Sequence, residues 1–229
     1  MSKRILCVAT NAHPMMHGKE TGLWLSELTH FIHVVKEAGY ECDIVGPKGG
    51  KITVDSASID GSYGKDPINV AFLADENMKA QLENSTPIAN VNASDYIAIY
   101  LAGGHGTLWD FRQSEELQAK ITEFHSQGKI LSAVCHGPSG LIDSKDKNGN
   151  LIVKGKNVTG FTNIEDRIAG VLSELPYLLE DELKKNGANY HKNILPFTSR
   201  VEVDGKLITG QNPQSAKAVA EKVVEALSK

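Results

Sequence analysis

The chain has 229 residues, of which 41% are hydrophobic and 23% are charged, and its formal net charge at pH 7 is −4. This length and composition predict one domain over residues 1–229 with a single well-buried core. The acidic balance excludes the broad positive surface on which nucleic-acid binding relies. No apolar run approaches the roughly 18 residues of a membrane span, and the three cysteines show no CxxC spacing. We therefore expect a cytoplasmic protein with no nucleic-acid partner, no membrane partner and no disulfide framework.

Apolar runs and helical periodicities alternate along the chain. The apolar run at 5–9 predicts a strand buried on both faces, and Leu25, Leu28, Ile32 and Val35 at helical spacing predict a helix over 21–38 that Gly39 ends. Further strands are predicted at 42–45, 96–102, 129–134 and 207–209, and helices at 114–127, near 175–185 and over 213–227. This alternation predicts an α/β fold, a doubly wound and mostly parallel sheet with helices on both faces, as in flavodoxin-like proteins.

Two segments depart from the simple alternation. Residues 47–92 are rich in Gly, Asp, Ser and Pro with one helical patch at 75–82, and we expect an insertion at the sheet edge that covers the functional site. Residues 198–209 carry Asp204-Gly205 between the runs 201–203 and 206–208, which predicts a hairpin.

The stretch from Ser132 to Pro138 places Cys135 between a strand and a Gly-rich helix start. A strand-to-helix turn of this kind makes a nucleophile elbow, in which a strained backbone exposes the reactive side chain. A helix N-terminus and the adjacent His136 are both expected to lower the thiol pKa from about 8.5. The alternative is a buried, inert cysteine followed by a surface histidine. We interpret Cys135 as the nucleophile.

A second Gly-rich strand end lies about thirty residues before Cys135, at Gly103-Gly104-His105. It follows the predicted strand 96–102, so it meets Cys135 at the carboxyl edge of the sheet, where ligand sites of such folds lie. Its backbone N–H groups are candidates for an oxyanion hole, and His105 is a candidate lining residue of the cleft.

These residues point to a family. The chain resembles the ThiJ/PfpI superfamily, part of the class I glutamine amidotransferase-like fold, and within it the heat-shock chaperone and glyoxalase III-like branch. The motifs that carry the resemblance are Glu20-Thr21-Gly22, Gly103-Gly104-His105-Gly106, Ala133-Val134-Cys135-His136-Gly137-Pro138 and Thr159-Gly160-Phe161-Thr162.

The resemblance implies a set of site residues. Cys135 is the nucleophile with His136 beside it, and Glu20 places a carboxylate within hydrogen-bond reach of the sulfur. A carboxylate so close to a thiolate must be protonated or share a proton. On its surroundings alone, Glu20 reads equally well as an acid at a helix N-terminus. The resemblance also implies an acid that orients His136, for which Asp166 is our choice and Glu165 the alternative.

The implied oxyanion donors are the backbone N–H groups of Gly104 and His136. The implied reaction is that of a glutathione-independent glyoxalase III, a lyase of the hydro-lyase class (lactate dehydratase) that detoxifies methylglyoxal to lactate, with protein deglycation as a further implied activity. No cofactor and no metal is expected. The expected partners are a small 2-oxoaldehyde, glycated or unfolded proteins, and a second copy in a homodimer. Two alternatives stay open: a stress-response holdase chaperone, and a small cysteine peptidase or amidase.

Overall fold

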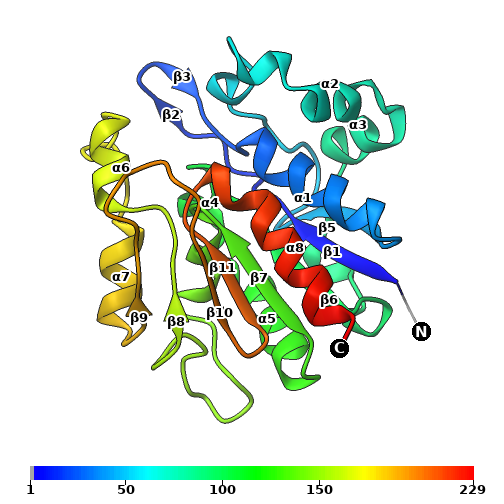
Figure 1. Ribbon diagram of the computed structural model, residues 1–229, viewed down its shortest axis with the longest axis vertical. Helices are drawn as coiled ribbons and strands as arrows, with labels where there is room; N and C mark the ends of the chain where they lie inside the picture. Colours follow the sequence, from blue (N-terminus) through cyan, green and yellow to red (C-terminus); the bar gives the residue numbers. More distant parts are fainter. Residues whose placement is uncertain (1–2) are drawn as a thin grey trace.

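The computed structural model describes residues 3–229 and confirms the predicted fold class, a mostly parallel sheet with helices on both faces (Figure 1). The seven strands of the main sheet have the order β10-β11-β7-β6-β1-β4-β5. Within the described chain, each of its pairings is parallel except that of β10 with β11. The strands are β1 Arg4–Val8, β2 Met15–Met16, β3 Lys19–Glu20, β4 Glu41–Gly46, β5 Thr86–Pro87, β6 Ala98–Leu101, β7 Ile130–Val134, β8 Asn157–Val158, β9 Asn189–Tyr190, β10 Val201–Asp204 and β11 Leu207–Gly210.

The helices divide between the two faces of the sheet. Helices α1 and α8 pack against each other and cover one face, whereas α5 packs on the other face against β6 and β7. No described helix has the length and apolar character needed to cross a membrane. The α-helices are α1 Leu25–Glu37, α2 Pro67–Ala74, α3 Glu76–Glu83, α4 Thr107–Asp110, α5 Glu115–Ser126, α6 Asn163–Ile168, α7 Leu179–Lys185 and α8 Ala216–Leu227, and short 3-10 helices include η1 Ser56–Ser58, η2 Tyr63–Lys65 and η5 Gly137–Leu141.

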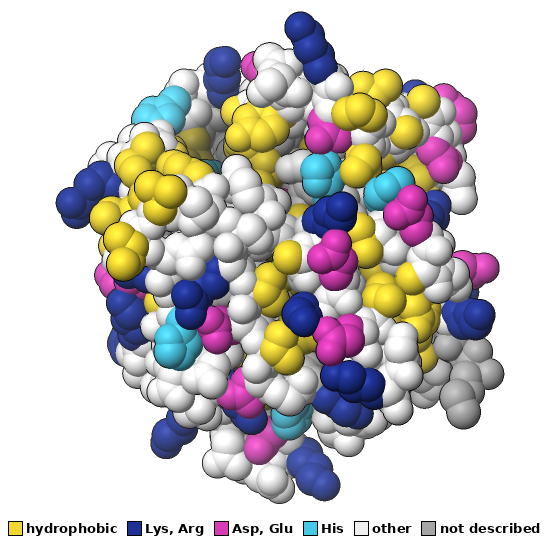
Figure 2. Space-filling model, viewed as in Figure 1, with side chains coloured by type: hydrophobic (Ala, Val, Ile, Leu, Met, Phe, Trp, Pro, Cys, Tyr) yellow, Lys and Arg dark blue, Asp and Glu magenta, His cyan; other side chains and the backbone are white. Residues whose placement is uncertain are grey.

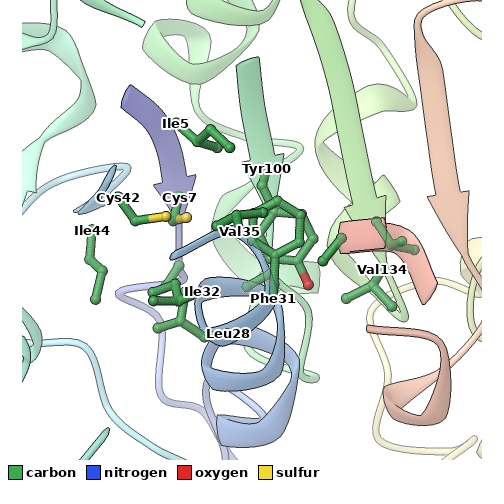
Figure 3. Close-up of a cluster of buried hydrophobic side chains, with 14 of the residues drawn as sticks. Ile5, Cys7, Leu28, Phe31, Ile32, Val35, Cys42, Ile44, Tyr100 and Val134 are labelled. Carbon is green, nitrogen blue, oxygen red and sulfur yellow. The ribbon is translucent and has the colours of Figure 1, made fainter. Parts of the chain in front are cut away.

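The strands are apolar on both faces because each face has its own core. In β1, Ile5 and Cys7 belong to the cluster under α1 and α8, whereas Leu6 and Val8 belong to the cluster under α5. In the first cluster the ring of Phe31, from α1, stacks on Tyr100 of β6 with a centroid separation of 3.6 Å (Figure 3). This contact fixes α1 on the sheet, next to the carboxyl ends of β6 and β7.

The first helix begins later than the sequence predicts. Residues 15–20 form the β2–β3 hairpin, and the chain then runs extended to Trp24. In this extended stretch the Leu23 N–H donates to the Thr53 carbonyl at 2.9 Å. Backbone pairing with the 47–92 segment therefore replaces the first turn expected at 21–24. Glu20 consequently lies in β3 and not in a helix.

The segment 47–92 contains η1, η2, α2 and α3 and ends in β5, which joins β4 at the edge of the sheet. Its η1 and η2 turns lie near the carboxyl ends of the central strands, where Ala57 and Tyr63 line cavities described below. On the molecular face in Figure 2, acidic and basic side chains are interspersed and neither sign forms a separate field.

The Phe31–Tyr100 stack predicts a measurable loss of stability. Phe31 is fully buried, so we expect Phe31→Ala to lower the free energy of unfolding by about 3–5 kcal/mol through lost apolar contact and a residual cavity. Val70→Ala on the exposed side of α2 is the control, with an expected change within about 0.5 kcal/mol. Urea titration of both variants checks this, and equal midpoints would contradict it.

Candidate active site

Cys135 occupies the elbow that the sequence predicts. It follows β7 directly and has φ 58°, a left-handed conformation that L-residues adopt at a cost. The backbone is held there from both sides: the Cys135 N–H donates to the Gly210 carbonyl at 3.0 Å, and its carbonyl accepts from the Phe161 N–H at 2.8 Å. The turn continues into the short 3-10 helix η5 in place of the α-helix start expected. The residue is 4% exposed, so the thiol meets a cavity and not open solvent.

Steric constraints around the elbow explain why glycine occupies positions 103 and 104. A Cβ on Gly103 would stand 2.9 Å from the Cys135 Cβ and closer still to the Glu27 carboxylate, so a side chain there would displace the site. Gly104 has φ 104°, which only glycine adopts readily, and its N–H hydrogen-bonds the Cys135 sulfur. The Gly103 N–H donates a hydrogen bond to Glu27 Oε2 at 2.9 Å. Gly104 is therefore the residue of this pair whose N–H faces the sulfur.

The carboxyl group beside the thiol belongs to Glu27, a residue of the first turn of α1. Glu27 is fully buried, and its carboxyl hydrogen-bonds the Cys135 thiol. The Glu27 carbonyl accepts the Tyr100 hydroxyl at 2.7 Å, which ties this turn of the helix to β6. The Oε1 atom has no nitrogen or oxygen partner. Burial raises the pKa of Glu27 to about 8, so the carboxyl is protonated at neutral pH.

The expectation that Glu20 supplies this carboxylate is wrong in its geometry. The Glu20 side chain is 57% exposed, and its Oε1 atom lies 3.4 Å from His13 Nδ1. Because the β2–β3 hairpin takes up residues 15–20, the helix starts five residues after Glu20. The acid that reaches the sulfur is therefore seven positions further along, at Glu27.

His136 and Asp166 form the rest of the expected constellation. The His136 Nδ1 atom lies 3.5 Å from the Cys135 sulfur, and its Nε2 atom lies 3.3 Å from Asp166 Oδ1. A proton on Nε2 satisfies the carboxylate and leaves Nδ1 free to accept from the thiol. Burial lowers the pKa of His136 against the opposing effect of Asp166, so the ring is neutral until it takes up a proton.

Asp166 is surrounded by two imidazoles. Besides His136, it accepts from His105 Nε2 at 3.1 Å, and the two rings lie 4.5 Å apart. Burial alone would raise the pKa of Asp166, but the two histidines outweigh it and hold the pKa well below its usual value. His105, Asp166 and His136 are also the described residues whose ligand atoms come close enough for a metal ion, all within 4.8 Å. The same atoms are engaged in the hydrogen bonds above, so a metal there would displace the contact that orients His136.

The surroundings of Cys135 do not lower its pKa as the sequence suggested. Burial raises the pKa of the thiol well above its usual value, and the charged form of Glu27 raises it further, while the Gly104 N–H acts in the opposite direction. The expected α-helix dipole is reduced to the short η5 turn. Ionisation of the thiol therefore needs a proton acceptor at the sulfur, and His136 Nδ1 is in that position.

Glu165, the alternative partner of His136, makes hydrogen bonds elsewhere in the structure. It is fully buried and forms a capping box with Thr162 at the start of α6. Its Oε1 atom accepts from the Phe197 N–H at 2.8 Å, from Asn212 Nδ2 at 2.9 Å and from Gln211 Nε2 at 3.0 Å. Sequence reasoning missed this role and that of Glu27, although Glu27 stands close to Leu25 and Leu28 in the sequence.

The Cys135 thiol opens into a small inner chamber of about 100 Å³. Its walls are mostly apolar and come from segments far apart in the chain. The lining residues are Trp24, Tyr63, Gly104, His105, Cys135, His136, Phe161, Ala169, Phe197, Pro213 and Gln214. An outer chamber of about 280 Å³ adjoins it and shares Trp24, His105 and Ala169 as lining residues. The expected site residue Glu20 lines this outer chamber.

Comparisons with known proteins agree with this geometry. The model of the family described as DJ-1/PfpI matches residues 20–226. A protein named glutathione-independent glyoxalase HSP31 from Saccharomyces cerevisiae is 33% identical over 98% of both chains. The crystal structure of glyoxalase III from Candida albicans is 30% identical over 97% of this chain and 96% of that chain, with a TM-score of 0.89. The structure of the 24 kDa rapid encystment protein of Francisella tularensis is 40% identical over 99% of both chains, with a TM-score of 0.93.

Cavity access predicts which cysteine reacts. Cys135 lines the inner chamber, whereas Cys7 and Cys42 are buried between β1, β4 and α1 with their sulfur atoms side by side (Figure 3). We expect dilute peroxide or iodoacetamide to modify Cys135 before the other two, because reaction requires access to the sulfur. Peptide mass spectrometry checks the order, with urea-unfolded protein as the control in which all three react. Earlier modification of Cys7 or Cys42 would contradict the assignment.

The raised pKa of Glu27 predicts a pH-dependent gain of stability on substitution. Between its ordinary 4.5 and about 8, the folded protein holds a proton that the unfolded chain has lost, so this group makes folding less favourable as pH rises. Glutamine carries no such proton. We expect Glu27→Gln to gain stability over the wild type between about pH 5 and about pH 8.5, with an upper limit on the order of 5 kcal/mol. Denaturant titrations at both pH values measure it, and a pH-independent difference would contradict the buried, protonated carboxyl.

Proposed function

We propose that this chain, which belongs to the DJ-1/PfpI family, is a glutathione-independent glyoxalase that converts methylglyoxal to lactate. The observation that carries the proposal is the small chamber lined by Cys135 and His136, together with the buried Glu27 carboxyl that hydrogen-bonds the same thiol. The names of the relatives point the same way, since those most similar over nearly the full chain include glyoxalases. The cysteine nucleophile, the lyase class and the roles below are part of the proposal.

In the first step the sulfur adds to the aldehyde carbon C1. His136 Nδ1 accepts the thiol proton as the C–S bond forms, and Asp166 stabilises the resulting imidazolium through Nε2. The aldehyde oxygen takes this proton, which gives a hemithioacetal and returns His136 to its neutral form. The backbone N–H groups of Gly104 and His136 are the donors for the developing negative charge on that oxygen.

In the second step the hydrogen on C1 leaves as a proton and C2 gains one. The electron pair of the C1–H bond forms a double bond between C1 and C2 while the C2 oxygen takes up a proton, which gives an enediol. C2 then gains a proton and the C1 hydroxyl loses one, so that the C1 carbonyl forms and the product is the thioester of lactate. Glu27 and His136 exchange these protons, and a carboxyl with a pKa of about 8 is suited to both giving and taking a proton near neutral pH. Water finally hydrolyses the thioester and restores the thiol. The sequence is an internal oxidation and reduction, balanced by water alone.

The size of the chamber also bears on the choice between the enzyme classes considered. About 100 Å³ accommodates a three-carbon dicarbonyl but not the backbone of a peptide with residues on both sides of the scissile bond. This favours the glyoxalase over a peptidase. The chaperone alternative needs an exposed apolar surface, and exposed apolar side chains are present at Ile164 and Ile168 on α6 and at Ile194 and Leu195 in the loop before β10. The expected homodimer follows from the resemblance. Both stay predictions.

The proposal predicts lactate formation from methylglyoxal without glutathione. Cys135→Ala should abolish it, and Glu27→Gln should lower kcat about 10²–10⁴-fold, because the amide keeps the shape of the carboxyl but exchanges no proton. Glu37→Gln makes the same chemical change on the exposed end of α1 and should retain wild-type turnover. Enzymatic lactate assay and circular dichroism of each variant provide the measurement. Absence of lactate with reduced, folded wild-type protein would refute the proposal.

A further inference from the structure

A small cavity of about 110 Å³ lies at the end of the sheet opposite Cys135, at the amino ends of β7 and β11. These two strands run parallel, and at their carboxyl ends the Cys135 N–H donates to the Gly210 carbonyl. The turn between β10 and β11 lines the cavity and is therefore a whole strand length away from the thiol (Figure 1). Among the described residues, none that lines this cavity also lines the inner or the outer chamber.

The cavity has an apolar floor and a rim of basic side chains. Leu131, Ile152 and Leu207 form the floor and are buried. The basic side chains come from four segments: the end of α5, the residue before β7, the residue before β8, and the turn between β10 and β11. They are His125, Lys129, Lys156 and Lys206. Positive groups that converge on one recess raise the local concentration of anions.

Lys129 and Lys206 are brought together by the register of the sheet. Each directly precedes its strand, β7 or β11, and the Leu131 N–H donates to the Lys206 carbonyl at 2.9 Å. Their ammonium groups donate to backbone carbonyls, Lys129 to Ala93 at 2.5 Å and Lys206 to Gly128. Because an ammonium group has three N–H donors, both lysines keep donors for a ligand in the cavity.

The carboxylate among the described lining residues is that of Asp204, and it is already engaged. Its Oδ1 atom accepts from Lys156 Nζ at 2.9 Å, and its Oδ2 atom accepts from the Asn157 N–H at 3.0 Å. The charges of Lys156 and Asp204 cancel. The lining therefore presents two further positive charges, those of Lys129 and Lys206.

The acids outside the cavity do not fully compensate the charge of Lys129. Burial lowers the pKa of Lys129, although Glu123 and Asp95 act in the opposite direction. Glu123 is itself paired with Lys120 at 2.8 Å. An anion in the cavity would stabilise the charged form of Lys129, because opposite charge nearby favours ionisation.

We propose that this cavity binds a phosphate group, either as free phosphate or as the end of a small phosphate monoester. A phosphate group carries a charge of about −1.5 to −2 near pH 7, which matches the charges of Lys129 and Lys206. Lysine binds phosphate as a point charge. A phosphate in this position connects the starts of β7 and β11, the two strands whose far ends hold Cys135. The site does not depend on the proposed glyoxalase function.

Calorimetric titration of the whole chain with inorganic phosphate, glycerol 3-phosphate and acetate, all at one ionic strength, tests the site. Lys206→Met removes one charge from an exposed side chain of the turn and keeps its apolar stem. Lys217→Met is the matched control, an exposed lysine on α8 outside this cavity. Asp204→Asn keeps the shape of the carboxylate and removes the opposing charge. The thermal midpoint with and without each anion is a second measure of binding, and circular dichroism verifies that each variant is folded.

We expect each phosphate to bind once per chain and acetate to bind about tenfold or more weakly. Lys206→Met should weaken phosphate binding about tenfold, because it removes a hydrogen bond to a charged group. Asp204→Asn should tighten phosphate binding, and Lys217→Met should leave it unchanged. Binding of one phosphate compound and not the other supports the site and identifies the source of the group. Absence of binding by both measures, acetate binding as tight as that of phosphate, or equal effects of Lys206→Met and Lys217→Met would overturn it.

Discussion

The contact between the Glu27 carboxyl and the Cys135 thiol is the constraint on which the rest of the site depends. Both groups are buried, burial raises the pKa of each, and each arrives on a different rigid element. Cys135 arrives on the strained end of β7, and Glu27 arrives on α1. The Phe31–Tyr100 stack and the hydrogen bond from Tyr100 to the Glu27 carbonyl set the height of that helix above the sheet. The packing of α1 on the sheet therefore determines where the Glu27 carboxyl lies and, through its burial, its protonation state.

The wall of the inner chamber that Phe197 forms depends on a second buried acid, Glu165. Glu165 and Asp166 are neighbours in α6, yet one faces the β10–β11 side and the other faces His136. Through Glu165 the helix is fixed to the Phe197 N–H, where φ is 57°, and to the side chains that follow β11. Phe197 in turn lines the inner chamber. One carboxylate therefore connects the segment that orients His136 with the segment that closes the chamber.

The sequence predicts the fold and half of the site because those features have local signals. Apolar runs identify β1, β4, β6, β7 and β11, and the Gly-rich turn after a strand identifies Cys135 and His136. Asp166 follows from the family pattern, and the structure distinguishes it from Glu165 by the contact with His136. The Glu20 assignment failed because helix periodicity does not reveal that residues 21–24 pair with a distant segment. A signal for Glu27 existed, since it lies in phase with Phe31 and Val35 on the apolar face of α1.

The two carboxyl groups near Cys135 and His136 differ in what surrounds them, and this assigns their chemistry. The Glu27 carboxyl has one backbone N–H and the Cys135 thiol as hydrogen-bond partners, and burial raises its pKa to about 8, which keeps it protonated. Asp166 has two imidazoles, which keep it ionised. Paired groups whose environments separate their pKa values take different acid and base roles. Asp166 can therefore support a positive charge on His136 when that ring takes the thiol proton, while Glu27 retains a proton to deliver. The negative charge of Asp166 lies on the side of His136 opposite the sulfur. The thiolate therefore forms next to a neutral Glu27 and not next to a second anion.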